Sequence, residues 1–334
     1  MISAILNHAG LKCGLIGSQG IKYNDIIIHT NNTTPESYDI FASFRKMVDN
    51  NIKYVAMEAS SQAFKLNRLA GLIFDYGILT NISNDHIGPG EHESHAEYLA
   101  CKNKLFLNSK NIIINNDSAS LAEVLKGSMP KPLTYALKNT ADLKVKEIDL
   151  INKEDFIGSS FTTTGLINDT FKLSIPGEFN IYNALCAITI CHIIGVKTEL
   201  IKEALLSFKV RGRMEVALST SKFKVIIDHA HTEDEMRALV KTLKSYNPKR
   251  LISIFGGNRP KERRYNLGEI IGGSSDLCIL TMDNPRFEEI SSINNDIKVG
   301  LSKVNCEYME IEDRALAIEY ACCNAEYGDL ILLV

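Results

Sequence analysis

The sequence predicts an α/β protein of two domains. Short apolar runs alternate with amphipathic stretches along most of the 334 residues, which is the pattern of a parallel sheet covered by helices. This length is roughly twice that of a typical single domain. Hydrophobic residues make up 45% of the sequence and charged residues 23%, so the chain can bury a sizeable core. The composition excludes a disordered chain, a collagen and a disulfide miniprotein.

We predict strands at the short apolar runs and helices at the amphipathic stretches. The predicted strands are Lys53–Met57, Tyr76–Thr80, Ile112–Asn115, Lys224–Asp228, Leu251–Phe255, Leu277–Thr281 and Asp329–Val334. The predicted helices are Glu36–Asp49, His95–Asn108, Asn180–Ile194, Glu199–Ser207, Thr232–Lys244 and Asp313–Asn324.

Two further segments define the predicted domain organisation. Between about residues 133 and 175, short β-like pieces separated by turn signals predict an antiparallel extension of the first domain. A fresh series of strands and helices begins after Lys209–Gly212. We therefore expect one domain over residues 1–209 and a second over residues 210–334.

The charge balance and the cysteines exclude several classes of protein. Forty acidic and 37 basic residues leave a net charge of −3, without the basic field of a nucleic-acid binder. The 8 cysteines form no CxxC pair, and we expect them to be reduced thiols in a cytoplasmic protein. The first residues do not resemble a signal peptide, and no apolar run reaches the roughly 18 residues of a membrane span.

Polar residues follow several of the predicted strands. These segments are Glu58–Ser61, Asn81–His86, Asp228–His231, Gly256–Arg259 and Asp283–Arg286. In open α/β sheets, ligands bind beyond the carboxyl ends of the strands. These five segments therefore contain the candidate ligand-binding residues.

Each candidate in the first domain has a functional and a structural interpretation. Glu58 can hold Mg²⁺ at the end of a strand, or it can cap the following helix. His86, His92 and His95 suggest zinc, but their irregular spacing without a thiolate favours solvated loop residues for His92 and His95. Lys102 lies on a helix with one apolar face, where an exposed lysine is the default.

The glycines Gly14, Gly17 and Gly20 have a GxxGxxG-like spacing after a short strand. The dinucleotide fingerprint GxGxxG is absent. We therefore interpret the three as turn glycines, and a dinucleotide-dependent oxidoreductase is the weakest of the candidate functions.

In the second domain, Asp228 and Asp283 both end predicted strands. Either carboxylate can accept hydrogen bonds from a ribose or an ammonium group, and helix capping is the alternative. Arg286 follows Asp283 by three residues and would place a cation near an anion. That combination suits a zwitterionic amino acid, whose carboxylate a guanidinium can bind with two hydrogen bonds.

Several segments, in order along the chain, match motifs of one family. They are Thr33–Glu36 (TTPE), Met57–Gln62 (MEASSQ), Thr80–His86 (TNISNDH), Ala100–Phe106 (ACKNKLF), Pro176–Leu185 (PGEFNIYNAL), Val210–Glu215 (VRGRME), Asp228–Thr232 (DHAHT) and Asp283–Arg286 (DNPR). As a set they resemble the Mur ligases of peptidoglycan synthesis, and within them the MurE type. The resemblance extends over nearly the whole chain.

The resemblance implies a fold and an activity. The fold would be a Mur ligase central domain with an ATPase-like parallel sheet, followed by a C-terminal Rossmann-like α/β domain. The activity would be that of an ATP-dependent acid–amino-acid ligase with ATP and Mg²⁺ as cofactors. It would add diaminopimelate or a similar diamino acid to UDP-N-acetylmuramoyl-L-alanyl-D-glutamate, in cell wall biogenesis that maintains cell shape. We expect a cytoplasmic monomer.

The resemblance also implies roles for individual residues. The catalytic and metal-binding residues would be Glu58, His86 and Lys102, the lysine as its carbamate. The contacts to the UDP-muramoyl-peptide would be Thr33, Thr34, Ser60, Ser61 and Arg68. The contacts to ATP would be Asn183, Arg213 and Asp228. The contacts to the incoming amino acid would be Arg259, Asp283, Asn284 and Arg286, and in the family DNPR accompanies diaminopimelate rather than lysine.

The sequence departs from the family pattern at both ends. The phosphate-binding motif GxxxxGK[ST] does not occur, and Met1 falls within the helix that should follow it. The family's UDP-binding domain before that motif is missing, and Asp329–Val334 resembles the strand before the family's GKGHE segment. We therefore expect little or no ligase turnover from this chain alone. It would be a fragment of a ligase or a non-catalytic binding paralogue.

Overall fold

The computed structural model describes residues 1–82, 87–88, 91–128, 130–257 and 260–334. The chain divides into two compact units. Unit 1 comprises Met1–Ile148, Phe161–Phe171 and Ile181–Ser207, and unit 2 comprises Asp149–Ser160, Lys172–Asn180 and Phe208–Val334. Two short segments from the middle of the chain therefore belong with the C-terminal residues. The domain boundary near residue 209 stays a prediction.

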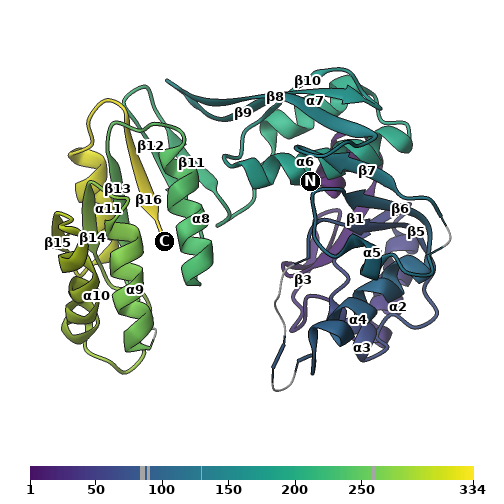
Figure 1. Ribbon diagram of the computed structural model, residues 1–334, viewed down its shortest axis with the longest axis horizontal. Coiled ribbons are helices and arrows are strands. Elements are labelled where there is room, and N and C mark those ends of the chain that lie inside the picture. The colour runs from purple at the N-terminus through teal and green to yellow at the C-terminus, as the bar shows by residue number, and fades with distance from the viewer. Residues whose placement is uncertain (83–86, 89–90, 129, 258–259) are drawn as a thin grey trace. The chain divides into compact units, whose positions relative to one another are not determined.

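Unit 1 alternates strands and helices in its first half (Figure 1). These elements are α1 (Ile2–His8), β1 (Cys13–Gly17), β2 (Gly20–Tyr23), β3 (Ile26–Ile28), α2 (Ser37–Asp49), β4 (Tyr54–Met57), α3 (Ser61–Lys65), β5 (Phe74–Leu79) and α4 (His95–Leu107). The strand β1 pairs in parallel with β4 and antiparallel with β2, so the first sheet has the order β3-β2-β1-β4.

A second sheet follows with the order β10-β9-β8-β7-β6-β5. Its further elements and the helices around it are β6 (Ser109–Asn115), α5 (Leu121–Val124), β7 (Leu133–Ala136), β8 (Leu143–Lys153), β9 (Phe156–Gly165), β10 (Thr170–Leu173), α6 (Glu178–Ile193) and α7 (Thr198–Ser207). Each neighbouring pair from β5 to β8 is parallel. The expected antiparallel extension is therefore wrong for β7 and β8, which continue the parallel pairing.

The helices of unit 1 bury apolar faces against these sheets. Met47 of α2 packs with Ile16 and Ile21 of the first sheet. In another cluster, α2, α3 and α4 meet through Ile40, Phe64 and Cys101, among others. This packing fixes α3 and α4, which contribute the candidate residues Ser61 and Lys102.

Unit 2 is built around a sheet of the order β11-β12-β16-β13-β14-β15. Its elements are β11 (Glu215–Ser219), β12 (Phe223–Ile227), α8 (Glu233–Lys244), β13 (Leu251–Phe255), α9 (Lys261–Gly272), β14 (Leu277–Leu280), α10 (Ile290–Val304), β15 (Tyr308–Glu310), α11 (Arg314–Cys323) and β16 (Asp329–Leu333). All neighbouring pairs are parallel except β11 with β12. The strands β13 and β16 are buried along their whole length, which explains why they are apolar except for Ser253 in β13 and Asp329 at the start of β16.

In unit 2, one helix packs directly against the strands, and other helices also pack against one another. On one face, Ala317 and Ala321 of α11 pack with Ile254 and Ile331 of the strands. The helix α9 packs against both α8 and α10 (Figure 1). The helix α8 begins with a capping box, in which Thr232 accepts a hydrogen bond from the Glu235 amide and Glu235 accepts one from the Thr232 amide.

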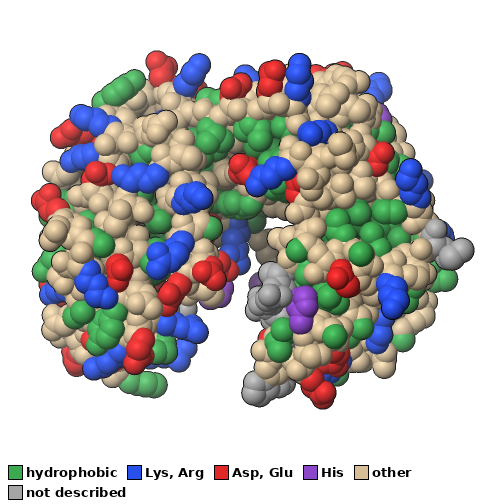
Figure 2. All heavy atoms as spheres, viewed as in Figure 1, with side chains coloured by type: hydrophobic (Ala, Val, Ile, Leu, Met, Phe, Trp, Pro, Cys, Tyr) green, Lys and Arg blue, Asp and Glu red, His purple; other side chains and the backbone are tan. Residues whose placement is uncertain are grey.

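Basic and acidic side chains are interspersed on the face drawn in Figure 2, as the small net charge leads one to expect. No helix in the described ranges is long and apolar enough to cross a membrane.

Gly14 and Gly17 lie within β1, and Gly20 begins β2 with a φ of +89°. Gly17 and Gly20 pair across the turn at residues 18–19, so the interpretation as turn glycines holds for these two and fails for Gly14.

Candidate functional site

In unit 1, the end of β4 is held by the side chain of Thr34. Its hydroxyl donates a hydrogen bond to the Glu58 carbonyl at 2.8 Å and accepts one from the Ser60 amide at 2.9 Å. Ser60 Oγ lies 3.2 Å from the same hydroxyl. Thr34 is completely buried, so this turn between β4 and α3 has a fixed shape. We refer to Thr34, Glu58 and Ser60 as the strand-end cluster.

The Glu58 carboxylate points away from the core and is exposed. Its Oε2 atom accepts a hydrogen bond from the Ser18 amide at 3.0 Å. A Cβ atom at Gly17 would lie 2.7 Å from the Glu58 Cδ atom, so the glycine leaves the space that the carboxylate occupies. The helix cap is Ser60, which accepts a hydrogen bond from the Ala63 amide. Among the described residues Glu58 forms no ion pair, which leaves an oxygen ligand suited to a hard cation such as Mg²⁺.

The other unit 1 residues that are predicted to contact the UDP-muramoyl-peptide differ in how exposed their side chains are. Thr33 is exposed. Arg68 Nη1 donates a hydrogen bond to the Thr34 carbonyl at 3.1 Å, and its Nε atom lies 2.8 Å from a Glu36 carboxylate oxygen. Ser61 is buried and lies within hydrogen-bonding distance of His92. The guanidinium of Arg68 and the hydroxyl of Ser61 thus already have partners within the protein.

The histidines near α4 do not form a metal centre in the described part of the chain. His92 is fully buried, so its interpretation as a solvated loop residue is wrong. His95 is the first residue of α4 rather than a loop residue. No group of three His, Cys, Asp or Glu side chains that could hold a metal occurs among the residues with described positions. His86 and Arg259, both predicted site residues, lie outside the described residues.

Lys102 lies on α4 and is half-buried, so the default of an exposed lysine does not hold. Burial lowers the pKa of its amine, because desolvation disfavours the charged form. Its Nζ atom lies 5.5 Å from the centroid of the Tyr98 ring. Within the described ranges, no carboxylate forms an ion pair with Lys102. The neutral amine, the form that adds CO₂ to make a carbamate, therefore forms more readily here than on an exposed lysine.

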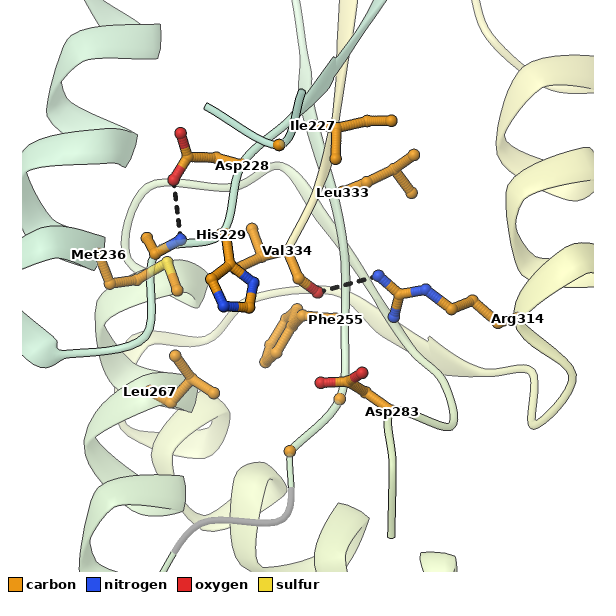
Figure 3. Close-up of a pocket in the computed structure, with 14 residues that line it drawn as sticks. Ile227, Asp228, His229, Met236, Phe255, Leu267, Asp283, Arg314, Leu333 and Val334 are labelled. Carbon is orange, nitrogen blue, oxygen red and sulfur yellow. Dashed lines mark hydrogen bonds between the residues drawn. The ribbon is translucent and has the colours of Figure 1, made fainter. Parts of the chain in front are cut away.

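In unit 2, a cavity of about 220 Å³ lies at the carboxyl ends of the parallel strands. Its lining comprises Gly212, Ile227, Asp228, His229, Ala230, Met236, Phe255, Gly256, Gly257, Leu267, Asp283, Arg314, Leu333 and Val334 (Figure 3). Gly256 allows the ends of β13 and β14 to approach, since a Cβ atom there would lie 2.2 Å from the Thr281 carbonyl oxygen. The cavity has the location expected of a ligand site in an open α/β sheet.

Asp228 forms one wall of this cavity, and each of its carboxylate oxygens accepts a hydrogen bond from a main-chain amide. Its Oδ2 atom accepts a hydrogen bond from the Met214 amide at 2.7 Å, and its Oδ1 atom accepts one from the Ala230 amide at 2.8 Å. Burial raises the pKa of this carboxyl group, while the two amides and Arg213 act in the opposite direction. Asp228 therefore shapes the loop after β12 in addition to facing the cavity.

Asp283 and Arg314 supply the cavity with opposite charges, and Figure 3 shows them on the side away from Asp228. Arg314 Nη2 donates a hydrogen bond to the Val334 carbonyl at 3.1 Å. Its Nη1 atom is buried and has no acceptor among the described residues. A buried donor without a partner is costly, so an anionic group in the cavity would be stabilised there. A zwitterion could meet both Asp283 and Arg314.

The sequence motifs did not single out Arg314, although one signal was present. Arg314 is the first residue of α11, directly after the cap Asp313. A basic side chain in the first turn of a helix opposes the helix dipole. Such a residue at the carboxyl edge of a parallel sheet is a candidate for anion binding.

The residues that follow Asp283 form an unusual turn. Asn284 has a φ of +42° and Arg286 a φ of +55°, both in the left-handed region that non-glycine residues rarely adopt. Asn284 and Arg286 are exposed and do not line the cavity. The predicted ATP contacts Asn183 and Arg213 are also exposed, on α6 and before β11 respectively. The roles of these four residues stay predictions.

Comparison with known proteins identifies the family. Residues 1–191 match the Mur ligase middle domain, and residues 212–334 match the domain described as Mur ligase, glutamate ligase domain. The chain belongs to the Mur ligase family. The predicted fold class is thereby confirmed as an α/β protein with a Mur ligase middle domain and a C-terminal α/β domain of mostly parallel strands.

Relatives of this Mur ligase chain resemble it over its whole length. A UDP-N-acetylmuramoyl-L-alanyl-D-glutamate--2,6-diaminopimelate ligase of Caldanaerobacter subterraneus subsp. tengcongensis is 40% identical over 339 residues, which cover 100% of this chain and 69% of that protein. A ligase of the same description from Clostridium acetobutylicum is 36% identical over 340 residues, with the same coverage. A solved structure of another such diaminopimelate ligase superposes with a TM-score of 0.79 at 25% identity, covering 99% of this chain and 69% of the other. The resemblance to the MurE type is confirmed by these matches.

Proposed function

We propose that the protein is a MurE-type chain of the ATP-dependent ligase that joins diaminopimelate or a similar diamino acid to UDP-N-acetylmuramoyl-L-alanyl-D-glutamate in cytoplasmic peptidoglycan synthesis, and that this chain alone, without the phosphate-binding motif, has little or no turnover. The observation that carries this proposal is the similarity of the whole chain to diaminopimelate ligases, at 40% and 36% identity. The intact DNPR segment at the rim of the unit 2 sheet supports the same substrate. Both domains of the chain would thus serve amide formation.

The strand-end cluster and the candidate residues around it are proposed to bind the muramoyl-peptide and the metal. Glu58, His86 and the carbamate of Lys102 would hold Mg²⁺, which would supply positive charge to the phosphoryl group during transfer. Glu58 suits this role because its carboxylate is exposed and Gly17 leaves room for it. Lys102 suits the carbamate because burial lowers the pKa of its amine. Thr33, Thr34, Ser60, Ser61 and Arg68 would form or support the contacts to the muramoyl-peptide.

The unit 2 cavity and the adjacent turn are proposed to bind the amino acid and part of ATP. Asp283 would accept hydrogen bonds from the ammonium group of diaminopimelate, while Arg314 would bind a carboxylate. Arg286 would bind the second carboxylate, which lysine lacks. Asn284 and Arg259 complete the proposed amino-acid contacts. Asn183, Arg213 and Asp228 are the proposed contacts to the nucleotide.

The proposed reaction has two steps, and the protein groups act on charge in both. The γ-carboxylate of the D-glutamyl residue attacks the terminal phosphorus of ATP, so an acyl phosphate forms and ADP leaves. The amine of diaminopimelate then attacks the acyl carbon, and phosphate leaves as the amide bond forms. A carboxylate such as Asp283 can orient the ammonium group before it loses the proton that makes it nucleophilic. Fixed donors and acceptors at these positions lower the barrier by orienting both reactants.

Isothermal titration of the 334-residue chain with diaminopimelate and with L-lysine tests the substrate. We expect diaminopimelate to bind about tenfold more tightly, because one additional charge-assisted hydrogen bond is worth roughly that ratio. Arg286→Ala should remove this preference without changing the binding of lysine. Arg237→Ala removes an exposed arginine of α8 outside the cavity and is the matched control. Equal affinity of the unmodified chain for both amino acids would contradict the proposed substrate.

A further inference from the structure

Two thiols that the proposed function does not use lie side by side in unit 2. Cys278 is on β14, and Cys306 lies between α10 and β15. Their Sγ atoms are 3.6 Å apart, although the residues are 28 positions apart in the sequence. The contact between the two sulfur atoms therefore comes from tertiary packing and not from a short sequence motif.

The main chain around the two thiols is held by the sheet. The strands β14 and β15 pair in parallel, with Cys278 opposite Tyr308. The Cys278 amide donates a hydrogen bond to the carbonyl of Glu307, the residue directly after Cys306, at 2.9 Å. Asn305 ends α10 with a φ of +51°, and the chain turns there toward β15. The backbone therefore keeps the two cysteines next to each other.

The side chain of Cys306 occupies a space at the end of α9. Gly272 leaves this space, since a Cβ atom there would lie 3.2 Å from the Cys306 Cβ atom. Cys306 Sγ lies 3.4 Å from the Ser275 carbonyl oxygen. These neighbours confine the sulfur beside Cys278. A disulfide requires the two sulfurs to approach by roughly 1.5 Å, which rotation of the side chains can supply while the backbone stays paired.

The two thiols differ in their access to solvent and in their acidity. Cys278 is completely buried, whereas Cys306 is half-buried. The hydrogen bond from the Cys278 thiol lowers the pKa of Cys306, while burial and the carboxylates of Asp276 and Glu307 act in the opposite direction. The same contact, together with burial, raises the pKa of Cys278. Because the thiolate is the reactive form, Cys306 is placed to react first and Cys278 second.

We propose that Cys306 and Cys278 form a reversible oxidation site, at which a peroxide converts the two thiols into a disulfide. The Cys306 thiolate attacks a peroxide oxygen, so the O–O bond breaks, a sulfenic acid forms and hydroxide leaves. The Cys278 thiol then loses its proton and its sulfur attacks the Cys306 sulfur, so the S–S bond forms, the S–O bond breaks and water leaves. Two thiols and one hydrogen peroxide thus give one disulfide and two water molecules.

This site is separate from the unit 2 cavity and does not depend on the proposed ligase function. The two cysteines lie toward the amino ends of β14 and β15, whereas the cavity lies at the carboxyl ends of the parallel strands. The loop that a disulfide would close runs from Cys278 through Asp283 and α10 to Cys306. Closing this loop restricts the unfolded chain, so calorimetry should show unit 2 unfolding at a higher temperature after oxidation. A lower unfolding temperature would mean that the sulfurs cannot bond without distorting the sheet, contrary to the inference.

Peptide mass spectrometry without reduction tests the disulfide in the 334-residue chain after treatment with hydrogen peroxide. We expect a cross-linked pair of peptides that contain Cys278 and Cys306, and we expect dithiothreitol to separate them. Cys323→Ser removes an exposed thiol of α11 outside the pair and is the matched control, in which the same cross-link should form. If Cys306 is oxidised, or stays unmodified, without any cross-link to Cys278, the inference is wrong.

The order of the two steps is tested with dimedone, which traps sulfenic acids. Cys278→Ser removes the second thiol, so the sulfenic acid of Cys306 should persist and its labelling should rise about tenfold over that of the unmodified chain. Cys278→Ala provides the same test if the serine variant does not fold. Equal labelling of Cys306 with and without the Cys278 thiol would overturn the inference, because Cys278 would then not react with the oxidised sulfur.

Discussion

Replacing Thr34 with valine tests the strand-end cluster in the most direct way. Valine has the shape of threonine but lacks the hydroxyl group, so the substitution changes hydrogen bonding and almost nothing else. The Glu58 carbonyl loses its donor at 2.8 Å, and the Ser60 amide loses its acceptor at 2.9 Å. Thr34 itself is completely buried, so water cannot replace the hydroxyl without opening the turn.

The expected size of the effect follows from these two hydrogen bonds. Each main-chain group left without a partner costs about 1 kcal/mol, so Thr34→Val should lower the free energy of unfolding by about 2 kcal/mol. For a unit of this size that corresponds to a decrease of about 4–8 °C in Tm. Thr34→Ser keeps the hydroxyl and loses one buried methyl group, which costs about 1 kcal/mol. Valine should therefore be the more destabilising substitution, although it is the more apolar one.

Differential scanning calorimetry with far-UV circular dichroism provides the assay, since the sequence contains no tryptophan for fluorescence. The transition of unit 1 is the one to compare, because a chain with two units need not unfold in one step. The same variants should be titrated with Mn²⁺, where Thr34→Val should weaken binding and Thr34→Ser should not. Equal stability of the two variants, or a less stable serine variant, would refute the role assigned to the Thr34 hydroxyl.

Three further predictions concern other parts of the molecule. Gly17→Ala should weaken Mn²⁺ binding about tenfold in a titration, because the new Cβ would lie 2.7 Å from the Glu58 Cδ atom. Lys102→Met should stabilise the protein at pH 7 in urea unfolding, and the gain should shrink as pH rises toward 10.5. Burial lowers the pKa of Lys102, so between its folded and unfolded values the unfolded chain binds more protons. Arg264→Met should cost about 3–5 kcal/mol by calorimetry, because it leaves Asp296 without the guanidinium that lies 2.9 Å away.

Each of these predictions has an outcome that contradicts it. Mn²⁺ affinity unchanged by Gly17→Ala would mean that Glu58 does not bind the cation in this position. A pH dependence of unfolding that is the same with and without Lys102 would contradict the assigned direction of its pKa. A loss below about 1 kcal/mol for Arg264→Met would place this ion pair with exposed pairs, despite the burial of Arg264.

The strands and most helices were predictable because their signals are local. Buried strands such as β13 and β16 are mostly apolar runs, and α2 and α8 have clear apolar faces. The helix α9 was missed because its buried residues include Arg264 and two glycines beside Ile270 and Ile271, which leaves no regular apolar face. A Cβ atom at Gly268 would lie 2.2 Å from the Ile297 carbonyl oxygen, so the backbones of α9 and α10 touch there. Periodicity of apolar residues cannot reveal a contact made by glycine.

The candidate site was predictable only in part, for a similar reason. Polar residues after strands are visible in the sequence, and they led to Glu58, Asp228 and Asp283. The contact between Ser61 and His92 joins residues far apart in the sequence, and no spacing rule connects them. Arg314 enters the unit 2 cavity only because α11 begins beside the end of β16. Both arrangements come from tertiary packing, and the sequence carries a local signal only for Arg314, as a basic residue in the first turn of a helix.

The turn after Asp283 has a consequence for how tightly an amino acid can be held. Left-handed geometry costs a residue with a side chain roughly 1 kcal/mol, and both Asn284 and Arg286 adopt it. In the proposed complex, a dicarboxylic amino acid that binds the Arg286 guanidinium holds this segment in its strained form, so part of the binding free energy offsets the strain.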